Sequence, residues 1–187
     1  MAPSSKPVPV LPVGRYQLVF RAAEPLPRRG YRGSAWRGVL GHSLKKLVCI
    51  TREKVCPECL LYRACVYPYV FETPPPPDAA KLRKYTAAPH PFVLVAGAEG
   101  EEEGREVRLG LNLFGRGNHY LPYLVHALGQ AAGDGLRPER IPMALVSVAQ
   151  EHPAGSGAWT EILQPNRTLT PFAPTPPATS RETSTSR

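Results

Sequence analysis

The clearest pattern along the chain is an alternation of hydrophobic and polar residues, which is typical of β-strands with one buried face. Residues 15–21 place Tyr16, Leu18 and Phe20 on one side of such a strand and polar or charged residues on the other. Hydrophobic stretches of similar length predict further strands at residues 92–95, 107–113 and 143–148, and a short extra strand at 159–163. The stretches at 92–95 and 107–113 are expected to pair as a β-hairpin.

A different period appears in residues 34–48, where hydrophobic residues recur at helical spacing. Trp36 shares one face of this predicted helix with Leu40, Leu44 and Leu47. The opposite face carries His42, Lys45 and Lys46. Ser34 is the expected N-cap. The helix is therefore expected to bury leucines and expose cations.

A second helix is predicted over residues 119–132, so the elements follow the order strand, helix, strand, strand, helix, strand. This is the split βαβ order of the ferredoxin-like fold, in which a four-stranded antiparallel sheet carries both helices on one face. The sequence therefore predicts a ferredoxin-like domain of the α+β class.

This domain is expected to cover residues 14–165, with a cysteine-rich insertion at residues 49–90. Residues 1–13 are rich in proline and are expected to form a flexible lead-in, and residues 166–187, rich in Pro, Thr and Ser, are expected to be disordered. No run approaches the roughly 20 apolar residues of a membrane helix, and the N-terminus lacks the apolar core of a signal peptide. We therefore expect a cytoplasmic protein without a membrane partner.

Positive charge is concentrated around the first predicted helix. The net charge is +8, and residues 15–65 hold 11 Lys and Arg against 3 Asp and Glu, whereas the rest of the chain holds 12 of each. A localised cationic surface attracts polyanions, because neutralising phosphates releases their condensed counterions. RNA or DNA is therefore the leading partner class, and a solvated cationic face without a ligand is the alternative.

The four cysteines of the chain all lie within 17 residues, at Cys49, Cys56, Cys59 and Cys65. This spacing suits tetrahedral thiolate coordination of one metal ion, with Zn²⁺ as the first choice. An iron–sulfur cluster, which uses the same four thiolates, stays open, as do disulfides and unligated thiols. A site closed by four cysteines leaves no open position, so the metal is expected to be structural.

Among the five histidines, His42 is the best candidate for proton transfer. Imidazole titrates near neutral pH, and Lys45 and Lys46 follow His42 by three and four residues. Tyr31 and Arg32 precede the same helix. An ordinary exposed helix histidine is the alternative. Loop, cap or surface positions are expected for His90, His119, His126 and His152.

Several short blocks stand in order along residues 15–165. They are residues 30–44 (GYRGSAWRGVLGHSL), Val48-Cys49, Cys56-Pro57-Glu58-Cys59, Cys65-Val66-Tyr67, Phe71-Glu72-Thr73-Pro74, Pro89-His90-Pro91-Phe92 and Leu113-Phe114-Gly115. In these blocks the chain resembles the CRISPR repeat-processing endoribonucleases of the RAMP superfamily.

The resemblance implies a protein of antiviral defence that binds the repeat of precursor crRNA and cuts it once without a catalytic metal. A 2′-hydroxyl attacks the adjacent phosphate, leaving a 2′,3′-cyclic phosphate and a 5′-hydroxyl. By the same resemblance His42 is the general acid/base, Tyr31 assists proton transfer and Lys46 holds the charge of the phosphorane. The concentration of basic residues makes Arg28, Arg29, Arg32, Arg37 and Lys45 the expected RNA-binding residues. Other CRISPR effector subunits are further candidate partners.

Members of this family usually carry a second ferredoxin-like domain with a glycine-rich, RNA-gripping loop, and no such domain follows residue 165. The chain therefore resembles an N-terminal portion, produced by truncation or frameshift, or a single-domain form. A non-catalytic crRNA-binding RAMP subunit and an inactive fragment are the alternatives to an endoribonuclease.

Overall fold

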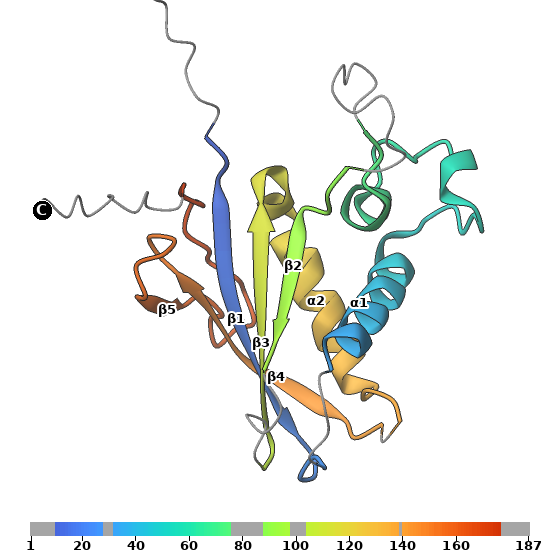
Figure 1. The fold of residues 1–187 in the computed structure, drawn as a ribbon. Helices are drawn as coiled ribbons and strands as arrows, with labels where there is room; N and C mark the ends of the chain where they lie inside the picture. Colours follow the sequence, from blue (N-terminus) through green and yellow to red (C-terminus); the bar gives the residue numbers. More distant parts are fainter. Residues whose placement is uncertain (1–9, 28–31, 76–87, 98–103, 139, 177–187) are drawn as a thin grey trace, which may run out of the picture.

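Two helices cover one face of an antiparallel sheet in the computed structural model of the chain (Figure 1). The structure describes residues 10–27, 32–75, 88–97, 104–138 and 140–176. In chain order the elements are β1 (Val13–Ala22), α1 (Gly33–Val48), η1 (Cys56–Glu58), η2 (Pro68–Glu72), β2 (Phe92–Ala96), β3 (Glu106–Phe114), η3 (Gly115–Tyr120), α2 (Leu121–Gly133), β4 (Met143–Glu151) and β5 (Trp159–Glu161).

The sheet has the strand order β2-β3-β1-β4-β5, and every neighbouring pair is antiparallel. Its first four strands have the order of the ferredoxin-like fold, so the predicted α+β class is confirmed. The predicted hairpin is confirmed as the β2–β3 pair. β5 pairs with the end of β4 and extends the sheet to five strands.

The alternation predicted for β1 is confirmed by burial. Leu18 is paired with Leu109 of β3 on one side and Val148 of β4 on the other, and all three side chains have an exposed fraction of 0%. Such a row of apolar side chains across three strands gives the helices a continuous surface to pack on. Full burial of one such side chain stabilises the fold by about 1.5–3 kcal/mol.

α1 packs on this surface through Trp36, Leu40 and Leu44, which are fully buried. Two details of the sequence prediction were wrong. Leu47, expected on the buried face, lies in the last turn where the chain leaves the helix for the insertion, and it is 43% exposed. Ser34 is not the N-cap, because the Trp36 N–H donates to the Arg32 carbonyl and the helix therefore begins at Gly33.

The second helix begins later than predicted, because residues 115–120 form the 3₁₀ turn η3 before α2 starts at Leu121. The buried Asn118 amide ties this turn to β1. Its Nδ2 donates to the Gly115 carbonyl (2.9 Å), and its Oδ1 accepts from the Tyr16 hydroxyl (3.2 Å). Burial raises the pKa of Tyr16 to about 12. Gly14 is required here, since a side chain would occupy the space of Asn118 and Tyr16.

The cysteine-rich insertion extends beyond the end of α1 and returns to the sheet (Figure 1). In its described part, residues 49–75 and 88–90, the helical elements are the 3₁₀ turn η1 and the π-helix η2. Val70 of η2 is 1% exposed and belongs to the main core. The ring of Phe71 lies 5.1 Å from that of Phe92 on β2. The end of the insertion is therefore anchored by hydrophobic packing.

Part of the tail expected to be disordered is ordered. Residues 166–176 run back along the sheet, where the Phe172 N–H donates to Gln150 Oε1 (2.9 Å) and the Val13 N–H donates to the Thr175 carbonyl (2.9 Å). The ordered unit therefore extends past the predicted boundary at residue 165. Residues 177–187, the rest of the predicted tail, and residues 1–9 of the predicted lead-in lie outside the described residues.

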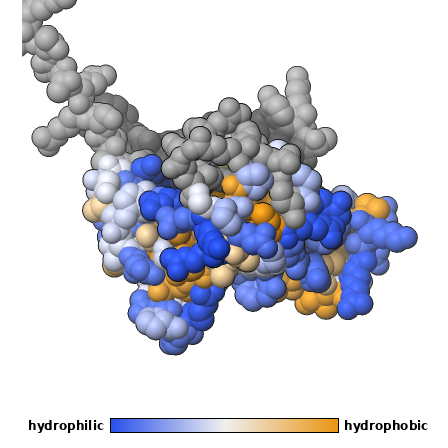
Figure 2. Space-filling model, turned by 90° about the horizontal axis from the view of Figure 1, so that it is seen from below, coloured by the Kyte–Doolittle hydropathy of each residue, from blue (hydrophilic) through white to orange (hydrophobic). Residues whose placement is uncertain are grey.

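Seen from below, the surface is mainly hydrophilic, with hydrophobic residues showing as interruptions in it (Figure 2). Within the described residues, none of the helices has the length and apolar composition needed to cross a bilayer.

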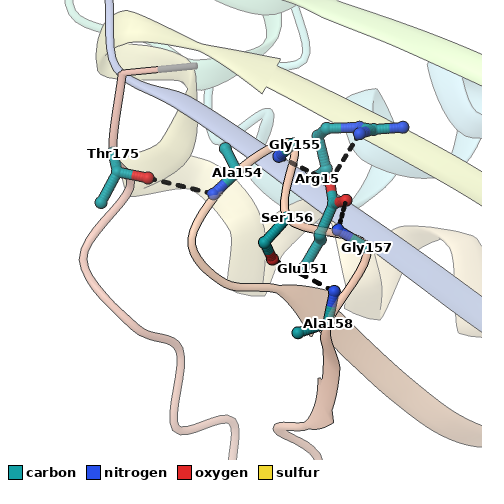
Figure 3. A network of polar contacts seen from close by, with 8 residues as sticks. All are labelled: Arg15, Glu151, Ala154, Gly155, Ser156, Gly157, Ala158 and Thr175. Carbon is teal, nitrogen blue, oxygen red and sulfur yellow. Dashed lines mark hydrogen bonds and ion pairs between the residues drawn. The ribbon is translucent and has the colours of Figure 1, made fainter. Parts of the chain in front are cut away.

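A buried carboxylate organises the loop between β4 and β5 (Figure 3). Glu151, 4% exposed, pairs with Arg15 of β1 at 2.6 Å and accepts hydrogen bonds from the Gly155 N–H (3.1 Å) and the Gly157 N–H (2.7 Å). Burial of the carboxylate acts to raise its pKa, but these three donors more than offset that effect and hold the pKa below its usual value. The charged form is therefore the one that the fold stabilises.

We predict that Glu151→Gln lowers the free energy of unfolding by about 2 kcal/mol, because two backbone N–H groups and a guanidinium lose a charged acceptor. Denaturant titration at neutral pH measures this change. Since the folded-state pKa is depressed, the contribution is present above the unfolded pKa and is lost as the pH falls through the folded pKa. The control is Glu106→Gln, because Glu106 pairs with Arg108 at the surface. We expect it to cost under about 0.5 kcal/mol, and equal losses in the two variants would contradict the role of Glu151.

Candidate functional site

The exposed face of α1 borders two hollows of the surface. We call the first the insertion hollow; it has a volume of about 580 Å³ and is lined by Gly41, His42, Lys45, Lys46, Cys49, Arg52, Glu53 and Tyr67. We call the second the interhelix hollow; it has a volume of about 630 Å³ and is lined by Ser34, Ala35, Gly38, Val39, His42, Ser43, Ala131, Asp134, Gly135, Arg137 and Arg140. The first lies between α1 and the insertion, and the second between α1 and the end of α2.

His42 lines both hollows, and its side chain is exposed. Lys46 follows one helical turn later and lines the insertion hollow with it. The structure thus brings together two of the three residues expected to act in catalysis. The third, Tyr31, lies outside the described residues.

Both hollows are cationic. Lys45, Lys46 and Arg52 line the insertion hollow against one acidic residue, Glu53. Arg137 and Arg140 line the interhelix hollow against Asp134. Concave surfaces lined by charge of one sign concentrate counter-ions of the other sign. The exposed face of α1 is therefore suited to a strand of phosphates.

Lys45 is held in place more firmly than an ordinary surface lysine. Its ammonium group donates to the Lys54 carbonyl (3.4 Å) and lies 5.3 Å from the centre of the Tyr67 ring. Burial acts to lower the pKa of Lys45, but the neighbouring Cys56 thiol more than offsets that effect, so the pKa is raised. Lys45 therefore supplies a fixed positive charge to the insertion hollow.

Gly41 lets the insertion approach α1 beside His42. A Cβ at this position would lie 3.2 Å from Cε1 of Phe71, which is closer than ordinary van der Waals contact. The missing side chain therefore allows η2 to pack directly against the helix. A larger residue would push away the wall that carries Tyr67.

The other predicted RNA-binding residues are placed differently. The Arg37 guanidinium lies over the rings of Phe71 (5.5 Å) and Phe92 (5.1 Å), and Arg37 does not line either hollow. Arg32 donates from Nη2 to the Pro27 carbonyl (3.1 Å). Arg28 and Arg29 lie outside the described residues.

Four residues of the site were not predicted from the sequence: Arg52, Tyr67, Arg137 and Arg140. Arg52 adopts a left-handed backbone conformation (φ 57°) in an irregular loop, which no periodic pattern could place. Arg137 and Arg140 follow α2, and only the packing of α2 beside α1 brings them to the site. For Arg137 and Arg140, the signal in the sequence was their position just after a predicted helix.

His90 has a more specific environment than the loop or surface position expected for it. It is half-buried, and its Nδ1 shares a hydrogen bond of 2.9 Å with Thr73 Oγ1. Burial lowers the pKa of His90, and the Arg37 guanidinium lowers it further, while a hydrogen bond with the Val70 backbone acts to raise it. The fold therefore favours the neutral imidazole.

We predict that His90 makes the protein less stable in mild acid. A folded-state pKa below the unfolded value means that the unfolded chain binds the proton more readily, so stability is lost as the pH falls through the unfolded pKa towards the folded one. Between about pH 7.5 and about pH 5.5, the Tm of the wild type should fall further than that of His90→Asn, in which a non-titrating amide can retain the bond to Thr73. Thermal unfolding of both proteins measures the difference, and parallel Tm curves would contradict the assignment.

No disulfide joins the four cysteines in the structure. In the parts of the chain that the structure describes, however, no group of three or more His, Cys, Asp or Glu side chains forms a ready metal site. The zinc or iron–sulfur site expected from the cysteine spacing therefore stays a prediction.

Comparison with known proteins gives one family. Residues 11–175 match the family AF_1859_N, which is described as an N-terminal domain. No curated protein and no solved structure matches the chain. The matched residues include all the helices and strands of the fold and reach into the ordered part of the tail. Since the match covers most of the sequence, the chain belongs to the AF_1859_N family of N-terminal domains.

Proposed function

We propose that this protein binds CRISPR repeat RNA along the exposed face of α1 and cleaves it once, with His42 as the proton-transfer group. The observation that carries the proposal is the position of His42, which lines both cationic hollows. An RNA strand that passes from one hollow to the other would bring a phosphodiester to the imidazole. The resemblance of residues 30–44 to repeat-processing endoribonucleases supports the same assignment.

The proposed reaction is an internal transesterification. The 2′-oxygen forms a bond to the adjacent phosphorus, and the bond from phosphorus to the 5′-oxygen breaks. The 2′-oxygen loses a proton and the 5′-oxygen gains one. His42 is proposed to carry out this proton transfer, with assistance from Tyr31. The products are a 2′,3′-cyclic phosphate and a 5′-hydroxyl.

Lys46 is proposed to stabilise the charge that develops on the phosphorane. A cation placed at that point lowers the barrier because it interacts more strongly with the transition state than with the substrate. The flanking phosphates would be held by Lys45, Arg52, Arg137 and Arg140. Arg28 and Arg29 are proposed as further RNA-binding residues because of their charge. The proposed location of the protein is the cytoplasm.

A second candidate is binding of crRNA without cleavage, as part of a larger CRISPR effector. One observation favours it: among the described residues lining the two hollows, His42 is the one imidazole, whereas five are cationic. Such a composition suits holding RNA as well as cutting it. The two candidates share the RNA surface and differ in the product.

We predict that the purified full chain, incubated with a labelled repeat RNA in EDTA, produces one cut that ends in a cyclic phosphate. His42→Ala should reduce the single-turnover rate by about 10²–10⁴-fold, as expected for loss of a general acid or base. The affinity for RNA should change by less than about twofold, since His42→Ala keeps all the lysines and arginines that line the two hollows. Gel analysis of the products and filter binding measure the two quantities.

The matched control for cleavage is His126→Ala, because His126 is exposed on α2 and lines a different surface. It should cleave at the wild-type rate. Cleavage by His42→Ala at the wild-type rate would remove His42 from the mechanism. Specific RNA binding with no product from the wild type would select the second candidate.

We predict that binding to a single-stranded RNA weakens steeply with salt. Each of Lys46→Ala and Arg140→Ala should reduce the slope of log affinity against log salt by about 0.7, the value for one phosphate contact to a single strand. Titrations at several salt concentrations measure the slope.

The control for binding is Arg108→Ala on β3, because Arg108 is exposed and paired with Glu106 away from both hollows. Its slope should equal that of the wild type. Slopes that fall equally in all three variants would indicate a diffuse charge effect and would contradict binding along α1.

A further inference from the structure

The four cysteines line one small cavity beneath the C-terminal end of α1. The cavity has a volume of about 20 Å³, and Cys49, Cys56, Cys59 and Cys65 all contribute to its wall. One water-sized sphere needs about 10–15 Å³ of such space. The cavity therefore matches a single ion in size and is much smaller than a four-iron cluster with its sulfides.

The cysteines reach this cavity from three separate pieces of chain. Cys49 directly follows α1, and its N–H donates to the Lys45 carbonyl (2.9 Å). Cys56 and Cys59 bracket the turn η1, which closes with the Cys59 N–H donating to the Cys56 carbonyl (3.0 Å). Cys65 comes just before η2. A bond from each to one common ion would join the helix end, the turn and the π-helix.

Hydrophobic packing does little to hold this part of the insertion. Ile50 is 84% exposed, Val55 is 48% exposed, Leu60 is 100% exposed and Leu61 is 42% exposed. By contrast, Cys56 is buried at 8% exposure. A segment whose apolar side chains face solvent while its four cysteines line one cavity requires another source of order, and small metal-bound segments obtain it from the ion.

Hydrogen-bonding groups lie beside one of the sulfur atoms, and a cation lines the cavity. The Leu61 N–H donates to Cys59 Sγ (3.4 Å), and Thr51 Oγ1 lies 3.2 Å from the same sulfur. Lys45 lines the same cavity as Cys56. Four thiolates around a divalent ion carry a net charge of about −2, so donors and a nearby ammonium are what such a site needs around it.

We infer that Cys49, Cys56, Cys59 and Cys65 bind one Zn²⁺ ion in a closed, structural tetrathiolate site. Binding draws the four sulfurs to about 2.3 Å from the ion by adjustment of the exposed segment between Cys49 and Cys65. The site also shapes the insertion hollow, because Lys45, Cys49, Glu53 and Tyr67 line both it and the cysteine cavity. Zinc would therefore fix the shape of the proposed RNA-binding surface and take no part in RNA cleavage.

The test is metal analysis of the full chain purified from zinc-supplemented cells without chelator. We expect about one zinc per chain, and X-ray absorption at the zinc edge should show sulfur ligands only, at about 2.3 Å. Cobalt substitution should give the visible absorption of a tetrahedral thiolate site, and zinc should displace the cobalt. These measurements use the wild-type protein and do not depend on the folding of any variant.

Cys59→Ser should lower the zinc content at least about fivefold under a competing chelator, since one thiolate of four is lost. The matched control is Thr51→Val, which removes the hydroxyl beside Cys59 and keeps all four thiols. It should retain about one zinc per chain. Iron with acid-labile sulfide, paired disulfides, or four free thiols without metal would each overturn the inference. None of these outcomes depends on whether the protein binds or cleaves RNA.

Discussion

The whole arrangement depends on the burial of one stripe of α1 between the sheet and α2. Trp36, Leu40 and Leu44 are fully buried there, and the Trp36 ring lies 5.0 Å from that of Phe20. Removing a side chain of this kind from a core costs about 2–5 kcal/mol, a large fraction of the roughly 5–15 kcal/mol that stabilises a domain. With one face of the helix fixed inward, the opposite face that carries His42 must lie outward.

The insertion completes the site that α1 begins. Its second half is held by apolar contacts, as Val70 and the stacked pair Tyr67 and Phe71 show (5.5 Å between ring centres). Its first half exposes apolar side chains, and its cysteines line one small cavity. The same segment therefore supplies a wall of the insertion hollow and the proposed zinc ligands. A change at the proposed zinc site is expected to alter the insertion hollow, because Lys45 and Tyr67 line both the cysteine cavity and that hollow.

The rest of the sheet provides a rigid frame for this face. Asn118 links η3 to β1, and Glu151 links β4 to β1 and to the following loop, each by several hydrogen bonds that satisfy a buried polar group. Buried polar groups with all partners in place fix one arrangement of the chain, because any displacement leaves a donor or acceptor unpaired. Neither network could be predicted from the sequence, because each joins residues that lie far apart in the chain. Tyr16 and Asn118 are 102 residues apart, and Arg15 is likewise far from Glu151 in the sequence.

The sequence by itself determined the order of strands and helices and the buried face of each. Those features follow from local periods of two and 3.6 residues, as Leu18 in β1 and Leu40 in α1 illustrate. It also placed His42 and Lys46 on one exposed face, because residues four apart on a helix are neighbours. Only the tertiary structure decided which cations join them. Arg52 and Arg140 approach α1 from an irregular loop and from the end of α2, and Arg37 is drawn instead onto the rings of Phe71 and Phe92. Such contacts depend on how distant segments pack, and no local pattern records them.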